Sequence, residues 1–253
     1  MKVTFLGTGT SQGIPVIACD CEVCQSTDPK DKRLRTSIHL EIDGLSLVVD
    51  TGPDFRQQML RENIQHLDAV VFTHAHKDHI AGMDDIRAYN FKQQSDIPVY
   101  ADSIVQEALH RDFYYVFAAE KYPGIPEVKL HTIENKPFSI DNTVITPIKV
   151  WHYKLPVLGF RFKDFTYITD ANSIDEEEKA KIRGSKALVL NALRKTEHIS
   201  HFTLNQAIAL SQELEIENTY LIHLSHQMGK HAQVEQELPK GIHIAYDGLK
   251  LQF

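Results

Sequence analysis

Short apolar runs that end in a polar, potentially metal-binding residue recur along this chain of 253 residues. One of them, Ala69 to Phe72, leads directly into Thr73-His74-Ala75-His76-Lys77-Asp78-His79. Such runs are typical of strands whose carboxyl ends meet along one edge of a sheet. The sequence therefore predicts a polar site along that edge. The other runs of this kind lead into Asp50, His152, Asp170 and His223.

The number of strand-like runs indicates the fold class. There are too many for one doubly wound sheet, so we expect an α/β fold in which two mixed β-sheets pack face to face with helices outside, an αββα sandwich. Strands are expected at residues 2–6, 38–42, 45–50, 68–73, 98–100, 143–150, 158–162, 165–169, 187–191, 219–223 and 242–246.

Helical patterns lie between these runs. Two of them have start signals, in which Ser173 is followed by Glu176 and Thr203 by Gln206, so that each pair can close a capping box. We expect helices at residues 54–62, 80–91, 102–112, 174–182 and 203–214.

The length and the composition suit a single globular domain over residues 1–253, with 42% apolar and 24% charged residues. The net charge of −7 argues against nucleic acid as the partner and favours a small substrate. We find no membrane span and no secretory signal, and we expect no membrane partner. With only three cysteines, the chain is expected in the reducing cytoplasm.

The histidine run is a candidate metal site. In an extended segment His74 and His76 lie on one side, and Asp78 and His79 follow at the turn into the next element. Neutral imidazole is the commonest nitrogen ligand for Zn²⁺, so one loop can serve two metals. Asp50 is expected either to accept a hydrogen bond from an imidazole of this loop or to be an ordinary turn residue.

The H-x-H-x-D-H spacing resembles the signature of the metallo-β-lactamase superfamily. Within it, the chain resembles the PhnP-type phosphoribosyl cyclic phosphate phosphodiesterases, a branch related to tRNase Z. The resemblance implies the metallo-β-lactamase fold and two active-site metals. Taken alone, His152 could be a half-buried strand residue and Asp170 a helix cap. By resemblance, His74, His76 and His152 hold one metal, Asp78, His79 and His223 hold the second, and Asp170 bridges them.

The resemblance implies a metal-dependent hydrolase, a phosphodiesterase that opens a small cyclic phosphodiester. Two divalent ions, Mn²⁺ or Zn²⁺, would share the hydroxide that attacks phosphorus. Asp78 is expected to bind metal and to steer that hydroxide. His201 aligns with the family's additional active-site histidine, so we assign it the phosphate-binding and general-acid role, with His198 as the second choice.

A second metal site is indicated by Cys19, Cys21 and Cys24, the only cysteines of the chain. Three thiolates at the spacing C-x-C-x-x-C predict a structural Zn²⁺. The spacing from His223 to His226 lets His226 complete a Cys₃His set, and PhnP-type proteins have a similar cluster. The alternatives are a redox-sensing thiol cluster or three unconnected buried cysteines.

Several alternatives stay open. Processing of the 3′ end of tRNA, as in tRNase Z, would require a basic, glycine-rich arm that we do not find. A non-catalytic metal-binding protein is the remaining class. Arg33 and Arg35 belong to a basic run that either contacts a substrate phosphate or is solvated. The expected partner is a small phosphodiester substrate, and relatives commonly form homodimers.

Overall fold

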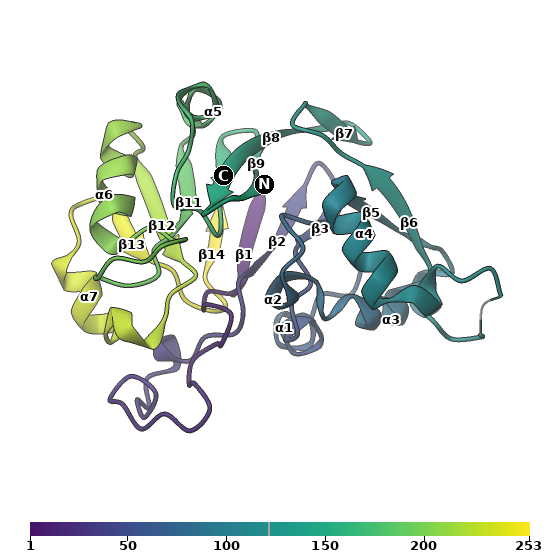
Figure 1. The fold of residues 1–253 in the computed structure, drawn as a ribbon, viewed down its shortest axis with the longest axis horizontal. Helices are drawn as coiled ribbons and strands as arrows, with labels where there is room; N and C mark the ends of the chain where they lie inside the picture. The colour runs from purple at the N-terminus through teal and green to yellow at the C-terminus, as the bar shows by residue number, and fades with distance from the viewer. Residues whose placement is uncertain (121) are drawn as a thin grey trace. The chain divides into compact units, whose positions relative to one another are not determined.

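The computed structural model describes residues 1–120 and 122–253, which form two mixed β-sheets of seven strands each, with helices beside them (Figure 1). The chain forms two compact units, and each sheet belongs to one of them. The expectation of one domain over residues 1–253 stays a prediction. Unit 1 contains Met1–Leu6, Ser37–Glu134 and Lys250–Phe253, and unit 2 contains Gly7–Thr36 and Asn135–Leu249.

The sheet of unit 1 has the strand order β14-β1-β2-β3-β4-β5-β6. Strand pairs β14/β1 and β2/β3 are antiparallel, and β3 to β6 are parallel. The carboxyl ends of β3 and β4 therefore lie at the same edge, which is where Asp50 and Thr73 follow them. The strands are β1 (Lys2–Gly7), β2 (Ser37–Ile42), β3 (Leu45–Val49), β4 (Ala69–Val71), β5 (Ile97–Ala101), β6 (Val128–Thr132) and β14 (Lys250–Gln252).

The helices of unit 1 are α1 (Phe55–Glu62), α2 (Lys77–Ile80), α3 (Arg87–Gln93) and α4 (Ser103–Asp112). Helix α4 contacts β5 and β6. A helix was expected without interruption over residues 80–91, but α2 ends at Ile80 and a 3₁₀ turn, Met83–Ile86, precedes α3. The interruption begins at Gly82, where the chain passes so close to Gly52 that a β-carbon would lie 2.1 Å from the Gly52 carbonyl oxygen.

The sheet of unit 2 has the strand order β13-β12-β11-β10-β9-β8-β7. Strands β7 to β10 pair in antiparallel fashion, and β10 to β13 are parallel. Residues Asp170 and His223 follow β10 and β12 at the carboxyl edge of the parallel part. The strands are β7 (Phe138–Ile140), β8 (Thr143–His152), β9 (Leu155–Phe162), β10 (Phe165–Tyr167), β11 (Ala187–Asn191), β12 (Asn218–Ile222) and β13 (Ile242–Ile244).

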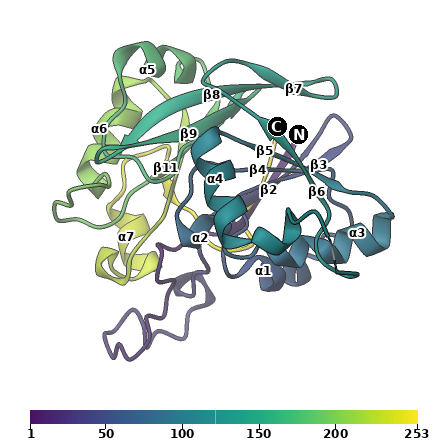
Figure 2. The ribbon, with the colours of Figure 1, turned by 45° about the vertical axis from the view of Figure 1, so that its right-hand side comes forward.

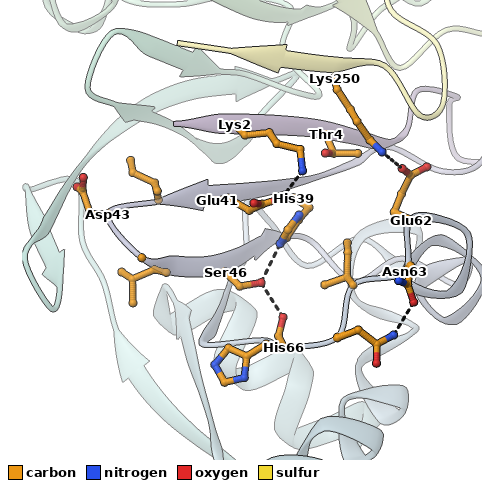
Figure 3. Close-up of a pocket in the computed structure, with 15 residues that line it drawn as sticks. Lys2, Thr4, His39, Glu41, Asp43, Ser46, Glu62, Asn63, His66 and Lys250 are labelled. Carbon is orange, nitrogen blue, oxygen red and sulfur yellow. Dashed lines mark hydrogen bonds and ion pairs between the residues drawn. The ribbon is translucent and has the colours of Figure 1, made fainter.

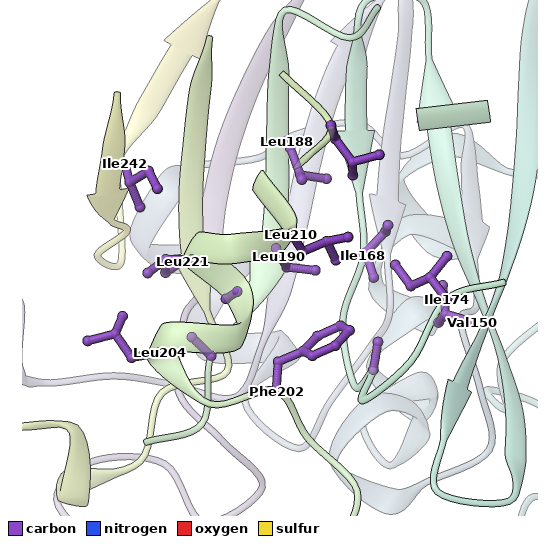
Figure 4. Close-up of a cluster of buried hydrophobic side chains, with 14 of the residues drawn as sticks. Val150, Ile168, Ile174, Leu188, Leu190, Phe202, Leu204, Leu210, Leu221 and Ile242 are labelled. Atoms are coloured by element: carbon purple, nitrogen blue, oxygen red, sulfur yellow. The ribbon is translucent and has the colours of Figure 1, made fainter. Parts of the chain in front are cut away.

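Three helices, α5 (Glu176–Ile182), α6 (Leu204–Glu213) and α7 (His231–Glu237), contact the sheet of unit 2 at β8, β11 and β13, respectively (Figures 1 and 2). Buried side chains from β8, β11, β12, β13 and α6 form an apolar core (Figure 4). The labelled members of this core are Val150, Ile168, Ile174, Leu188, Leu190, Phe202, Leu204, Leu210, Leu221 and Ile242.

One of the two expected capping boxes is present. The Thr203 hydroxyl accepts a hydrogen bond from the Gln206 amide, and the Gln206 side chain accepts one from the Thr203 amide. The box expected at Ser173 is wrong, because α5 begins after Asp175. Ser173 instead pairs with Trp151 through its backbone.

The expected fold class is confirmed, and every expected strand is present. Strands β6, β7 and β14 and helix α7 were not expected. None of these three strands contains two adjacent apolar residues. Strand β6 contains a lysine and a histidine, β7 has a central serine, and β14 has a single apolar residue, so no apolar run marks them. No helix among the described residues combines the length and the apolar character needed to cross a membrane.

Candidate metal centres

The histidine loop of unit 1 follows β4 and leads into α2. Nε2 of His74 lies 3.1 Å from Nδ1 of His76, and the ring centroids of His74 and His79 are 4.2 Å apart. Two imidazole nitrogens bound to the same Zn²⁺ at 2.0–2.1 Å would be about 3.3 Å apart. The loop therefore holds His74 and His76 at a spacing suited to one ion.

Asp50 fixes the orientation of two of these imidazoles. It is fully buried and accepts hydrogen bonds from Nδ1 of His79 at 2.7 Å and from the hydroxyl of Thr73 at 2.8 Å. Since that hydroxyl donates to Asp50, it accepts from Nδ1 of His74 at 3.0 Å. Both histidines then keep Nε2 as a lone-pair donor for a metal. Burial raises the pKa of Asp50, and the His79 imidazole opposes this.

Asp78 lies in the first turn of α2, and its Oδ2 is 3.3 Å from Nε2 of His79. The Asp78 carboxylate thus faces Nε2 of His79, the ring nitrogen that does not bind Asp50. Two ligands of the same metal ion lie at a similar distance from each other. Lys77 points away, because its side chain is largely exposed and forms an ion pair with Asp112. Unit 1 therefore brings together two pairs of possible ligands, His74 with His76 and Asp78 with His79.

Unit 2 brings together a second donor set from strand ends and one loop. The donor atoms of His152, Asp170 and His201 lie within 4.8 Å of one another. Nε2 of His223 is 3.3 Å from a carboxylate oxygen of Asp170. The rings of His201 and His223 stack with centroids 4.7 Å apart. Three of the four residues are buried, and His152 is partly exposed.

The protonation of this second set suits a divalent cation. His152 donates Nδ1–H to the Ser200 carbonyl oxygen at 2.7 Å, which leaves Nε2 as a lone-pair donor. Nδ1 of His201 is buried, and within the part of the chain that the structure describes it has no hydrogen-bond partner. Burial lowers the pKa of His201 to about 3, and the nearby His223 adds to this. Imidazoles beside a buried carboxylate form a typical ligand set for Zn²⁺ or Mn²⁺.

The low pKa of His201 also bears on its expected general-acid role. A histidine acts as a general acid in its protonated, cationic form. His201 would therefore need a bound anion to raise its pKa before it could donate a proton. His198 lies beside it with ring centroids 5.2 Å apart, and burial followed by the Arg194 charge lowers its pKa as well. The roles of His201 and His198 stay predictions.

Three polar residues that follow strands have left-handed backbone conformations. Asp50 has φ 66°, and Asp170 and His223 each have φ 54°. Asp and His adopt this region more readily than most non-glycine residues, and such outliers gather at functional sites. The turn at each strand end therefore favours the same residue types that can bind or orient a metal.

Sequence reasoning did not find Thr73 or Asn191. Thr73 links Asp50 to His74, as described above. Asn191 ends β11 and clamps the residue after Asp170, because its side chain accepts from the Ala171 amide at 2.8 Å and donates to the Ala171 carbonyl at 2.9 Å. Asn191 ends an apolar run, so the pattern that indicated the other sites could also have indicated this residue.

The cysteine cluster lies entirely within unit 2. Sγ of Cys19, Cys21 and Cys24 lie 3.3, 3.4 and 3.5 Å from Nδ1 of His226. A tetrahedral Zn²⁺ with bonds of 2.3 Å to sulfur and 2.0–2.1 Å to nitrogen would set these pairs about 3.5 Å apart. The sequence thus predicted which four side chains come together.

Hydrogen bonding and burial act differently on two of these thiols. The Cys24 amide donates to Sγ of Cys21, which lowers the pKa of Cys21 to about 6 and makes it a thiolate at neutral pH. Burial raises the pKa of Cys24 to about 11, and the neighbouring sulfur atoms add to this. A buried thiol beside a thiolate is stabilised as a second thiolate when a cation binds both. The donor set is closed and soft, which fits structural Zn²⁺.

Arg33 and Arg35 have different surroundings. Arg33 is 4% exposed and donates to the Thr8 hydroxyl at 2.7 Å and the Ala245 carbonyl at 2.5 Å. Burial lowers the pKa of Arg33 to about 10, although Asp247 and other carboxylates oppose this. Arg33 is therefore a structural residue, and Arg35, which donates to the Ser11 carbonyl at 3.1 Å, is partly exposed.

The model of one known family, described as the beta-lactamase superfamily domain, matches residues 46–224. That match spans most of the chain. The chain belongs to the beta-lactamase superfamily. Membership supports the expected enzyme class, a hydrolase that uses divalent metal, at the level of the family.

Two relatives share 38% of their residues with this superfamily member. One is a protein of Porphyromonas gingivalis named octanoyltransferase, with which the match covers 99% of this chain and 51% of that protein. The chain thus spans about half the length of this relative. The other is a solved structure described as a new diphosphatase from the PhnP family, with a TM-score of 0.93 and coverage of 100% and 97% of the two chains.

The short form of human tRNase Z is also similar. Its structure has a TM-score of 0.70 at 18% identity, and the match covers 100% of this chain and 99% of that one. A likeness at this identity shows the shared fold alone.

Proposed function

We propose that this chain is a phosphodiesterase that depends on two divalent metals and hydrolyses a small cyclic phosphodiester. The observation that carries the proposal is that each unit gathers imidazoles and a carboxylate at distances suited to metal ligands. That both sets serve one metal pair is taken from the resemblance of the H-x-H-x-D-H motif. In this proposal His74, His76 and His152 hold one ion, Asp78, His79 and His223 hold the other, and Asp170 serves both.

A bound metal pair would supply an acidified water molecule and an electrophile for the phosphoryl oxygen. The protein's own residues prepare the site for this chemistry. Asp50 and the Ser200 carbonyl hold His79 and His152 in the tautomer that presents Nε2. His201 is proposed to bind the phosphate, which would raise its pKa, and then to protonate the departing oxygen.

A diphosphate is the second candidate substrate. The specific observation in its favour is the 38% identical structure described as a diphosphatase from the PhnP family. In both reactions water attacks phosphorus opposite an oxygen leaving group, which is a sugar oxygen in the cyclic phosphodiester and a phosphate oxygen in the diphosphate. The same donor set therefore suits both substrates.

Octanoyl transfer is proposed to belong to the other half of the Porphyromonas gingivalis relative. The chain matches only 51% of that protein, and the donor sets here are those of a metal hydrolase. All three cysteines of the chain lie in the proposed zinc site, which leaves no further thiol to carry an acyl group.

The test is an assay of metal-free protein loaded with Mn²⁺ or Zn²⁺. The substrates are bis(p-nitrophenyl) phosphate, a phosphoribosyl cyclic phosphate, a dinucleoside diphosphate and an octanoyl thioester. We expect turnover of a phosphodiester, and we expect Asp170→Asn to lose activity by at least about 100-fold together with bound metal. Asp164→Asn, a change at an exposed carboxylate, is the control. Full activity in Asp170→Asn, or turnover of the thioester alone, would contradict the proposal.

A further inference from the structure

A hollow of about 590 Å³ opens on the sheet of unit 1, lined by residues from β14, β1, β2 and β3 and by the segment after α1 (Figure 3). Ser46, near the amino end of β3, is part of its lining. The histidine loop follows the carboxyl end of β4, which is parallel to β3. Within unit 1 the hollow is therefore separate from the metal-binding residues.

Two ion pairs line the hollow, together with Asp43. Lys2 lies 2.6 Å from Glu41, and Lys250 lies 3.1 Å from Glu62 (Figure 3). Three of these four side chains are 41–51% exposed. A small ion would meet charges that are already neutralised, whereas mixed polar surfaces of this kind are usual where two domains meet.

The floor of the hollow is neutral and ordered. His39 is 5% exposed, and its Nε2 contacts the Ser46 hydroxyl at 2.8 Å. That hydroxyl donates to the His66 carbonyl at 2.6 Å, so it accepts from His39. Burial lowers the pKa of His39 to about 4, which keeps the imidazole uncharged at neutral pH. The shape of this face is thus set before any partner arrives.

Both ends of the chain lie at the rim of this hollow. The Met1 amino group donates to the Phe253 carbonyl at 3.0 Å, and the Phe253 amide donates to the Met1 carbonyl at 2.9 Å. Lys2 and Lys250, beside these ends, line the hollow. In the Porphyromonas gingivalis relative, the match leaves about half of the protein unaccounted for. A segment joined to either end of the matched part starts at this rim.

We propose that the hollow and its charged rim form a docking surface for a domain homologous to the unmatched half of that relative. A short flexible tether between two domains supplies an effective concentration on the order of 1 mM, so a polar interface of modest area would be enough to keep the two halves of the relative together. The inference does not depend on the proposed hydrolase activity.

The probe is the unmatched half of the Porphyromonas gingivalis relative, produced as a separate protein and titrated into the full chain. Calorimetry gives the Kd, and hydrogen exchange locates the contact. We expect saturable binding and slower exchange at residues 39–46 and 62–66. No binding up to about 1 mM, protection confined to other segments, or occupation of this face by a second copy of the chain would overturn the proposal.

Charge variants test the surface itself. Glu41→Lys places a like charge beside Lys2, and we expect at least about 10-fold weaker binding. The double variant Lys2→Glu with Glu41→Lys restores the internal pair but reverses what the partner meets, so binding should stay weak. Asp164→Lys, at an exposed ion pair with Lys186 in unit 2, is the matched control and should bind normally. Recovery in the double variant, or equal weakening in the control, would overturn the proposal.

Discussion

Gly82 sets how closely the histidine loop approaches the turn after β3. The Gly82 amide donates to the Thr51 carbonyl at 2.8 Å, and the Thr51 amide donates to the His79 carbonyl at 2.8 Å. A β-carbon at residue 82 would lie 2.1 Å from the Gly52 carbonyl oxygen and 2.8 Å from the β-carbon of Phe55. Contacts of this kind need at least about 3 Å, so Gly82→Ala would force the two segments apart by roughly 1 Å.

We expect two consequences of Gly82→Ala. Overpacking costs about 1–3 kcal/mol of unfolding free energy, which urea titration measures. A displacement of about 1 Å between Asp50 and His79 would lower kcat by about 100-fold and weaken metal binding, which an assay with metal analysis would detect. Ala81→Ser, at the exposed neighbouring residue, is the control. Unchanged stability together with unchanged metal content would refute the close-approach argument.

Three further predictions concern buried polar groups. The pKa of His39 is about 4 in the folded protein and near 6.5 in the unfolded chain, so the unfolded chain binds a proton first and the free energy of unfolding falls as the pH drops from 6.5 to 4. In His39→Gln this fall should be smaller by about 3 kcal/mol, which urea titrations at pH 7 and pH 4 measure. Cys24→Ser should lose one zinc equivalent by metal analysis and lower Tm by roughly 5–10 °C, whereas unchanged zinc content would argue against the site. Arg33→Met should cost about 3–5 kcal/mol of unfolding free energy, because it leaves the Ala245 carbonyl and the Thr8 hydroxyl without their buried donor. A cost below about 1 kcal/mol in a urea titration would contradict this.

Much of the fold was predictable from apolar runs of ordinary length. Strand β11, for example, is five buried residues and stands out in the sequence. Strand β14 has three residues and is a strand because it pairs with β1, a contact between distant parts of the chain. Local pattern carries no information about such pairing. The start of α5 was missed for a related reason, since Ser173 is engaged by Trp151 and is not available as a cap.

The donor residues were predictable because their chemistry is unusual at strand ends. His74, His76 and the cysteine cluster are recognisable by spacing alone. The residues that orient them were harder to find, because a threonine or an asparagine beside a strand is common in any protein. Thr73 has a role only because Asp50, distant in sequence, accepts its hydrogen bond.

The left-handed turns at Asp50, Asp170 and His223 limit what a mutational survey of this protein can reveal. A β-branched residue at any of them would disturb the backbone and the metal chemistry at once, so loss of activity there cannot be ascribed to either cause. Asparagine and glycine tolerate the same conformation while removing the charge or the imidazole. Asparagine and glycine at these three positions therefore remove the metal-binding or orienting group while keeping the backbone conformation. A selection experiment should include these two replacements, because a loss of activity in them reports on the side chain and not on folding.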